Sequence, residues 1–314
     1  MADPSSPESA PATTPQVTLL LVHGAGFCKE IWDPIIYRLR ESSLLRDMPT
    51  EVLAIDLPFH GNKRDESVAP QIKVLSPTSV RVEHPASGWI TWAPNEVYEQ
   101  VKALRRRQDA NKQKRTAVIG IGHSMGAASL WQAETTHPGT FDGLLLFEPT
   151  YGPNDAATSL KADFLISVVL RREASWPSRD AAVAYFESYR NFAAWDRESL
   201  AGYLKGALVS ECEGSETAVL ATHPRIEAAM YSGVPVFFPE TRDMQKPKCS
   251  IVWLSGSRSR LFASEYFEPM AKEFPQIYRI AAPIPNLSHL MILESPSEST
   301  AKILKELAQL PVYQ

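Results

Sequence analysis

Cysteine is scarce in this chain of 314 residues. The three cysteines, Cys28, Cys212 and Cys249, lie far apart in the sequence and form no CxxC pair. Disulfide frameworks and cysteine-based metal sites both need closely patterned cysteines, so the sequence argues against both. We therefore expect free thiols in a reducing compartment.

An excess of basic residues and long apolar runs are also missing. Lys and Arg number 32 against 36 Asp and Glu, and this net charge of -4 argues against binding to nucleic acid or to an anionic membrane. No apolar run approaches the ~18 residues that a membrane-spanning helix needs. Neither nucleic acid nor a membrane span is therefore an expected partner.

The two ends of the chain carry no recognisable address. The segment 1–15 is rich in proline, alanine, serine and threonine, and it has no basic start followed by an apolar core. This composition predicts a disordered tail rather than a secretory signal. The last residues, 309–314, differ from an S-K-L-type peroxisomal address, so a cytoplasmic location is expected.

Short apolar runs alternate with helical patterns along the chain. Six runs are apolar on both faces, as buried parallel strands are. They span Gln16–Val22, Glu51–Leu57, Thr116–Ile121, Leu144–Phe147, Ile251–Leu254 and Ile277–Ala282. Among the helices between them, one is expected to begin with Asn95 as its N-cap. The alternation predicts an α/β fold with a mostly parallel, doubly wound sheet.

The alternation stops between residues 151 and 248. This segment has helical stretches at Ser159–Arg172, Arg179–Phe192 and Glu198–Val209 but no convincing strand. We therefore expect a core over 16–150 and 249–314, with a helical lid inserted over 151–248.

Two further stretches allow more than one interpretation. The segment 61–94 is irregular, and its Trp89 and Trp92 belong either to a surface excursion or to the entrance of a site. The basic cluster over 102–115 is expected to be the solvated face of a helix, and a phosphate-binding patch is the less favoured alternative.

The strongest motif is Gly122-His123-Ser124-Met125-Gly126, which matches G-x-S-x-G. It follows a predicted strand and precedes a helical stretch, which is the context of a turn that exposes a nucleophilic serine. Ser124 is therefore the predicted nucleophile.

An oxyanion site is expected beside Ser124. The sequence His23-Gly24-Ala25-Gly26-Phe27 follows the first predicted strand, where backbone amides of such folds stabilise a tetrahedral oxyanion. We predict the amides of Met125 and Ala25 as donors, with Gly26 as the second choice for the latter.

The predicted general base is His289. It lies after the last predicted strand, so the chain order of nucleophile, acid and histidine is that of α/β hydrolases. His23 and His123 are expected to be structural, His60 to brace its own loop, and His137 to cap a helix.

The acid that orients the histidine lies at a less usual position in the chain. The turn after Ile251–Leu254, its usual place, has no carboxylate before Glu265. Glu148, however, ends the neighbouring strand 24 residues after Ser124. We predict Glu148 as the acid and keep Glu265 as the alternative.

Fold and site together resemble the α/β-hydrolase superfamily over about Val17 to Leu307. The segment Gly26-Phe27-Cys28-Lys29-Glu30-Ile31-Trp32 is similar to the Gly-Phe-x-Lys-Glu-x-Trp segment of a fungal group. That group includes peroxisomal lipase-like enzymes, acyl-CoA hydrolases of polyketide pathways and hydrolases assigned to toxin biosynthesis. Its members place the acid after the strand that follows the nucleophile helix, as Glu148 does here, although they carry Asp at that position and some end in a peroxisomal address. Two N-terminal strands that are common in the superfamily are expected to be absent here. When these two strands are included in the numbering, the lid is inserted after the sixth strand.

The resemblance and the motifs together predict a serine hydrolase of esters or thioesters, with no metal and no organic cofactor. The expected partner is a small hydrophobic acyl substrate, which the aromatic residues of the lid favour, and the oligomeric state stays open. Those aromatic residues are Trp176, Tyr185, Phe186, Phe192 and Trp195. Acyl transfer or cyclisation by the same triad, and a non-catalytic binding module on the fold, remain alternatives. Epoxide and haloalkane hydrolysis are disfavoured, because those relatives have Asp where Ser124 stands.

Overall fold

The structure is a computed structural model that describes residues 15–77, 79–153, 155–236, 238, 240–261 and 264–314. The predicted tail lies outside the described residues, except for Pro15. Six parallel strands form the central sheet in the order β11-β10-β6-β5-β1-β2. They are β1 (Val17–Val22), β2 (Thr50–Ile55), β5 (Ala117–His123), β6 (Gly143–Phe147), β10 (Ser250–Leu254) and β11 (Tyr278–Ile280). Each predicted run forms one of these strands, which confirms the α/β fold.

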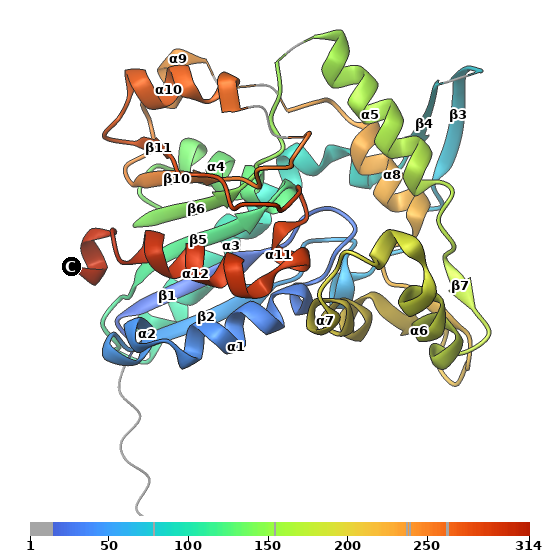
Figure 1. Cartoon of the computed structure of the whole chain (residues 1–314), viewed down its shortest axis with the longest axis horizontal. Helices are drawn as coiled ribbons and strands as arrows, with labels where there is room; N and C mark the ends of the chain where they lie inside the picture. Colours follow the sequence, from blue (N-terminus) through green and yellow to red (C-terminus); the bar gives the residue numbers. More distant parts are fainter. Residues whose placement is uncertain (1–14, 78, 154, 237, 239, 262–263) are drawn as a thin grey trace, which may run out of the picture.

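The sheet is buried on both faces because its side chains alternate between two apolar cores. Val17, Leu19 and Leu21 of β1 belong to one core, and Leu20 and Val22 belong to the other. The helices α1 (Asp33–Glu41), α2 (Ser43–Asp47) and α12 (Pro296–Leu307) cover the first face. The helices α3 (Trp89–Ala110), α4 (Met125–Thr136) and α10 (Glu268–Glu273) cover the second (Figure 1). The short helix α11 (Met291–Glu294) leads into α12.

The strand order creates a crevice at one edge of the sheet. From β1 the chain moves to β2 and later returns to β5 on the other side of β1. Loops that leave the carboxyl ends of β1 and β5 therefore diverge, and open α/β sheets bind ligands at such a point. The loop after β1 and the turn after β5 are the two segments predicted to hold the oxyanion donors and the nucleophile.

The segment 151–248 between β6 and β10, here called the insertion, has two halves (Figure 1). It contains α5 (Ala156–Val169), α6 (Arg179–Ser188), α7 (Arg197–Ala207), α8 (Pro224–Ser232) and α9 (Thr241–Met244). The expectation of no strand is wrong, since β7 (Ser175–Trp176), β8 (Leu208–Ser210) and β9 (Ala218–Leu220) form a small antiparallel sheet. Buried residues of α5 and α8 belong to one core of the central sheet, and those of α6 and α7 belong to the other. The two halves of the insertion are therefore anchored on opposite faces of the sheet.

The segment 61–94 is more regular than predicted. It forms a hairpin of β3 (Gln71–Ser76) and β4 (Ser79–Glu83) and then the 3-10 turn Pro85–Gly88. The next helix, α3, already begins at Trp89 and continues through Pro94, so the N-cap predicted at Asn95 is wrong. The basic cluster near the end of α3 is mostly exposed, and Arg107 pairs there with Glu51.

Candidate active site

Ser124 occupies a strained turn between β5 and α4. Its backbone has φ 53° and ψ -117°, a left-handed conformation that is costly for a residue with a side chain. Glycine is required nearby, because a Cβ at Gly126 would lie 2.4 Å from the carbonyl oxygens of Val22 and His23. The Ser124 amide donates to the carbonyl of Phe147 at 2.9 Å, which ties the turn to the end of β6. This strand–turn–helix geometry is the one predicted from G-x-S-x-G.

Glu148 is the first residue after β6, and its carboxylate is directed at His289. The distance from Glu148 Oε2 to His289 Nδ1 is 2.6 Å. The Ser259 hydroxyl also donates to Oε2 at 2.7 Å, and the Gly256 amide donates to Oε1 at 3.0 Å. Glu148 is 2% exposed and has φ 43°, so its backbone too is held in a strained conformation. Glu265, the alternative acid, lies exposed on the 3-10 turn Ser264–Tyr266.

The turn after β10, where the acid of such folds usually lies, instead supplies hydrogen-bond donors to Glu148. Gly256 and Ser259 lie in this turn and supply two of the donors to the Glu148 carboxylate. A carboxylate that accepts several such bonds is held in a fixed orientation. The acid thus follows β6, and two of the groups that donate hydrogen bonds to it follow β10.

His289 lies in the loop between β11 and α11. Its backbone carbonyl accepts a hydrogen bond from His123 Nε2 at 2.9 Å, and the two rings are 4.7 Å apart. Its Nδ1 faces Glu148, so Nε2 is the nitrogen that remains for proton transfer. In this structure the Ser124 hydroxyl lies 3.1 Å from Thr150 Oγ1.

Thr150 is a residue of the site that the sequence motifs do not predict. Its amide donates to the Ser124 carbonyl at 3.2 Å, so backbone and side chain both contact Ser124. Its only signal in the sequence is its place two residues after Glu148. The contact depends on the pairing of β5 with β6, which a local motif does not encode.

The two residues predicted to supply the oxyanion donors lie in the loop after β1 and at the start of α4. Ala25 and Met125 both line the cavity that contains Ser124. Met125 is the first residue of α4, so its amide has no intrahelical partner. Gly26, the second choice, is engaged elsewhere, because its amide donates to His60 Nε2 at 3.0 Å. The geometry therefore favours Ala25 over Gly26.

Three buried histidines around the site are neutral, and two of them, His23 and His60, brace this loop. His60 Nδ1 donates to the Pro58 carbonyl at 2.8 Å, and burial lowers the pKa of His60 to about 3. Burial also lowers the pKa of His23, whose Nδ1 donates to Gly24 and whose Nε2 accepts from the Leu57 amide. Burial lowers the pKa of His123 well below its usual value. The structural roles predicted for these residues agree with the contacts.

The Lys29-Glu30 pair of the similar fungal segment ties the same loop to β2. Lys29 Nζ bonds Asp56 Oδ2 at 2.8 Å and Glu30 Oε1 at 2.6 Å, and the Lys29 amide donates to Asp56 Oδ1. Burial opposes charge on Asp56, but the bonds from Lys29 outweigh it and lower the pKa of Asp56. The ion pair fixes the loops after β1 and β2 to each other beside the oxyanion amides.

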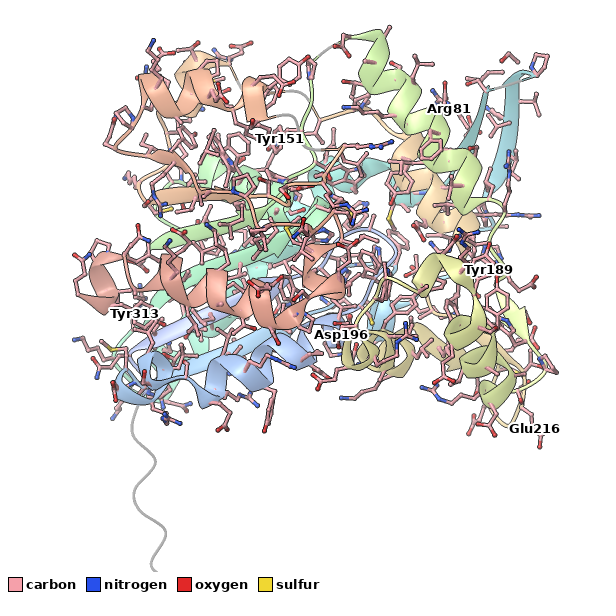
Figure 2. All side chains as sticks on the ribbon, viewed as in Figure 1. Arg81, Tyr151, Tyr189, Asp196, Glu216 and Tyr313 are labelled. Carbon is pink, nitrogen blue, oxygen red and sulfur yellow. The ribbon has the colours of Figure 1, made fainter. Side chains whose placement is uncertain are left out.

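A cavity of about 550 Å³ joins these groups. Ser124, Glu148 and His289 line it from the sheet edge, and residues of the insertion complete its walls. Of the predicted lid aromatics, Phe192 and Trp195 line the cavity, whereas Trp176 and Phe186 belong to the apolar core. Trp89 also lines it, while Trp92 packs on Phe59. Tyr151, labelled in Figure 2, is a further lining residue.

Two properties of the described residues bear on other ligands. Among them, no group of three or more His, Cys, Asp and Glu side chains is arranged to hold a metal ion. Within the same ranges, no helix is both long and apolar enough to cross a membrane.

A serine on a strained turn, an acid at a neighbouring strand end and a histidine after the last strand are the arrangement of the α/β-hydrolase fold. The chain belongs to the Alpha/beta hydrolase family, whose family model matches residues 19–303. This membership confirms the superfamily resemblance drawn from the motifs.

Individual relatives match parts of the chain. An abhydrolase domain-containing protein, AKT2, from Alternaria alternata is 30% identical over 99 residues, 32% of this chain. The type I acyl-CoA thioesterase mpaH from Penicillium roqueforti is 23% identical over 55% of this chain. The chain covers 36% of the length of each of these relatives. The peroxisomal alpha-beta-hydrolase Lpx1 from Saccharomyces cerevisiae has a similar fold, with a TM-score of 0.71 at 17% identity, over 97% of this chain and 79% of that one.

Proposed function

We propose that the protein is a serine hydrolase that cleaves an ester or thioester of a hydrophobic, secondary-metabolite-like substrate through an acyl-enzyme. The observation that carries the proposal is the 2.6 Å contact between His289 and the buried Glu148, in the cavity that also contains Ser124. A carboxylate in this position holds the imidazole in the correct tautomer and stabilises its cation.

The proposed reaction has two stages, the formation of an acyl-enzyme and its hydrolysis. Ser124 Oγ attacks the carbonyl carbon while His289 Nε2 accepts the hydroxyl proton, and the amides of Ala25 and Met125 stabilise the oxyanion. The carbonyl–oxygen or carbonyl–sulfur bond then breaks, and His289 returns the proton to the leaving alkoxide or thiolate. His289 then takes a proton from water, whose oxygen attacks the acyl carbon. The bond between that carbon and Ser124 Oγ breaks, His289 returns the proton to Oγ, and the acid is released.

Two features support a bulky apolar substrate. Aromatic residues of the insertion, Phe192 and Trp195, line the same cavity as Ser124 and His289. The relative mpaH is a thioesterase of acyl-CoA, which supports a thioester among the candidate substrates. We propose the insertion as the lid of this site, and the cytoplasmic location stays a prediction from the sequence.

A covalent probe tests the proposal directly. We expect a fluorophosphonate to add to Ser124, detected by mass spectrometry of the labelled peptide. Ser124→Ala should abolish labelling and lower the turnover of p-nitrophenyl butyrate and butyryl-CoA by about 10⁴-fold or more, with an unchanged melting temperature. Ser188→Ala, an exposed serine of α6, is the matched control and should retain both. Turnover in Ser124→Ala near that of the natural protein would overturn the proposal.

Product analysis distinguishes hydrolysis from the transfer alternative. Acyl transfer and cyclisation use the same acyl-enzyme and differ only in the group that accepts the acyl chain. We expect the free acid as the product when an alcohol and water compete. An ester or lactone as the main product would assign the triad to transfer.

A further inference from the structure

A polar cluster lies in the wall that the insertion contributes to the cavity. Arg172 Nη1 donates to Glu227 Oε2 at 2.7 Å, and Arg172 Nη2 donates to the Tyr203 hydroxyl at 3.3 Å. The Tyr231 hydroxyl lies 3.5 Å from Glu227 Oε1. All four residues line the same cavity as Ser124. The cluster joins the end of α5 to α7 and α8 across the two halves of the insertion.

The charges in this cluster are balanced and fixed. Burial opposes the charge on Arg172, but Glu227 outweighs it and raises the pKa of the guanidinium. Burial raises the pKa of Tyr203 to about 12 and also raises the pKa of Tyr231, so both hydroxyls stay neutral. The cluster therefore presents one cation, one anion and two neutral hydroxyls. Burying such a pair does not by itself favour folding over an apolar replacement, which leaves its purpose to be explained.

The cluster lies beside the oxyanion loop rather than far from the chemistry. A Cβ built on Gly26 would be 2.4 Å from Glu227 Oε2, so the carboxylate packs directly on the residue after Ala25. An unpaired carboxylate there would repel the negative charge that develops on the substrate oxygen. Arg172 cancels this charge, and arginine has more N–H donors than its two bonds use.

We propose that Arg172, Glu227 and Tyr231 form a subsite for a neutral hydrogen-bonding group, a hydroxyl or keto oxygen, on the acyl part of the substrate. The inference rests on the proposed function, because the acyl part is the one that stays attached to Ser124 next to this loop. A purely apolar acyl chain would leave without a partner the Arg172 N–H donors that its bonds to Glu227 and Tyr203 do not use. A carboxylate would meet Glu227 beside Arg172, so charge repulsion excludes it.

Three aryl esters of similar length test the subsite. We expect kcat/KM for p-nitrophenyl 3-hydroxybutyrate to exceed that for p-nitrophenyl butyrate by about tenfold, the effect of one net hydrogen bond. The p-nitrophenyl monoester of succinic acid should be the poorest of the three. Equal kcat/KM values for the three esters would overturn the subsite.

Variants assign the selectivity to named groups. Glu227→Gln keeps the shape of the side chain but leaves Arg172 unpaired, so we expect the succinate ester to overtake the butyrate ester, a reversal of the natural order. Tyr231→Phe should reduce the ratio of the hydroxybutyrate to the butyrate ester several-fold. Tyr189→Phe is the matched control with unchanged ratios, since Tyr189 is 40% exposed beside α6 (Figure 2). An unchanged order in Glu227→Gln would overturn the proposed charge balance.

A binding measurement separates this inference from the proposed function. In Ser124→Ala, the affinities of methyl 3-hydroxybutyrate, methyl butyrate and monomethyl succinate can be measured by NMR titration without turnover. We expect the same order as for the rates. That order without any Ser124-dependent hydrolysis in the natural protein would support the subsite and overturn the proposed function. Hydrolysis with equal affinities would do the reverse.

Discussion

The two walls of the cavity are built differently. On the sheet edge, the backbone fixes the groups: Ser124 and Glu148 both have positive φ, and Met125 presents the free amide of a helix start. On the insertion side, side chains from separate helices form the wall, and an ion pair between Arg172 and Glu227 holds them together. Rigid backbone suits chemistry that tolerates little displacement, whereas side chains on an insertion suit selection among substrates. Changes at the sheet edge should therefore lower turnover of every substrate, and changes in the insertion should alter ratios between substrates.

The largest effect after loss of Ser124 is expected for the acid. Glu148→Gln keeps the size of the side chain but removes the charge that stabilises the His289 cation. We expect kcat to fall by about 10³-fold for all esters, with little change in melting temperature. Glu265→Gln is the matched control and should be nearly silent, because that side chain is exposed. A Glu148→Gln enzyme that kept its kcat would remove Glu148 from the triad.

A smaller loss is expected for a positioning residue behind the sheet-edge wall. His60 holds the Gly26 amide, next to the predicted donor Ala25. His60→Leu removes the acceptor and leaves a buried N–H without a partner, so we expect kcat to fall about 10- to 100-fold while KM changes little. His60→Gln, which offers a carbonyl acceptor, should restore part of kcat. An increase in KM with an unchanged kcat would assign His60 to substrate binding instead.

The same histidine predicts how stability depends on pH. The pKa of His60 is about 3 in the folded protein and near 6.5 in the unfolded chain, so the unfolded state binds its proton first as pH falls. The contribution of neutral His60 is complete above pH 6.5 and is lost as pH decreases toward 3, at up to about 1.4 kcal/mol per pH unit. Denaturant unfolding at several pH values should show a shallower dependence in His60→Gln than in the natural protein. An identical slope would mean that His60 is not buried neutral.

The contrast between the walls also explains what the sequence could predict. The six central strands were predicted because strands buried on both faces are continuous apolar runs, and G-x-S-x-G is a local motif whose strand and helix are adjacent in sequence. The hairpin of β3 and β4 was missed because both strands are short and β3 is exposed, although Ile72 and Val74 alternate with polar residues and pair with Val82 and Val80. Arg172 and Glu227 were missed because their pairing spans 55 residues and depends on how the turn after α5 packs on α8. Glu148 was found only because the usual turn lacked a carboxylate.

The smallest effect is expected from the aromatic part of the insertion wall. Trp195 lines the cavity and packs edge-on against Phe27, with ring centroids 5.9 Å apart. Trp195→Leu keeps an apolar side chain but enlarges the cavity, so kcat/KM for p-nitrophenyl benzoate should rise several-fold relative to p-nitrophenyl butyrate. Trp176→Leu makes the same change in the same half of the insertion and in the same apolar core, but Trp176 is not among the described residues that line the cavity. It should lower the melting temperature through lost packing and leave the ratio unchanged. If both variants altered the ratio equally, general loosening of the insertion would explain the effect. The proposed division between a sheet edge that carries the reaction and an insertion that selects substrates would then be wrong.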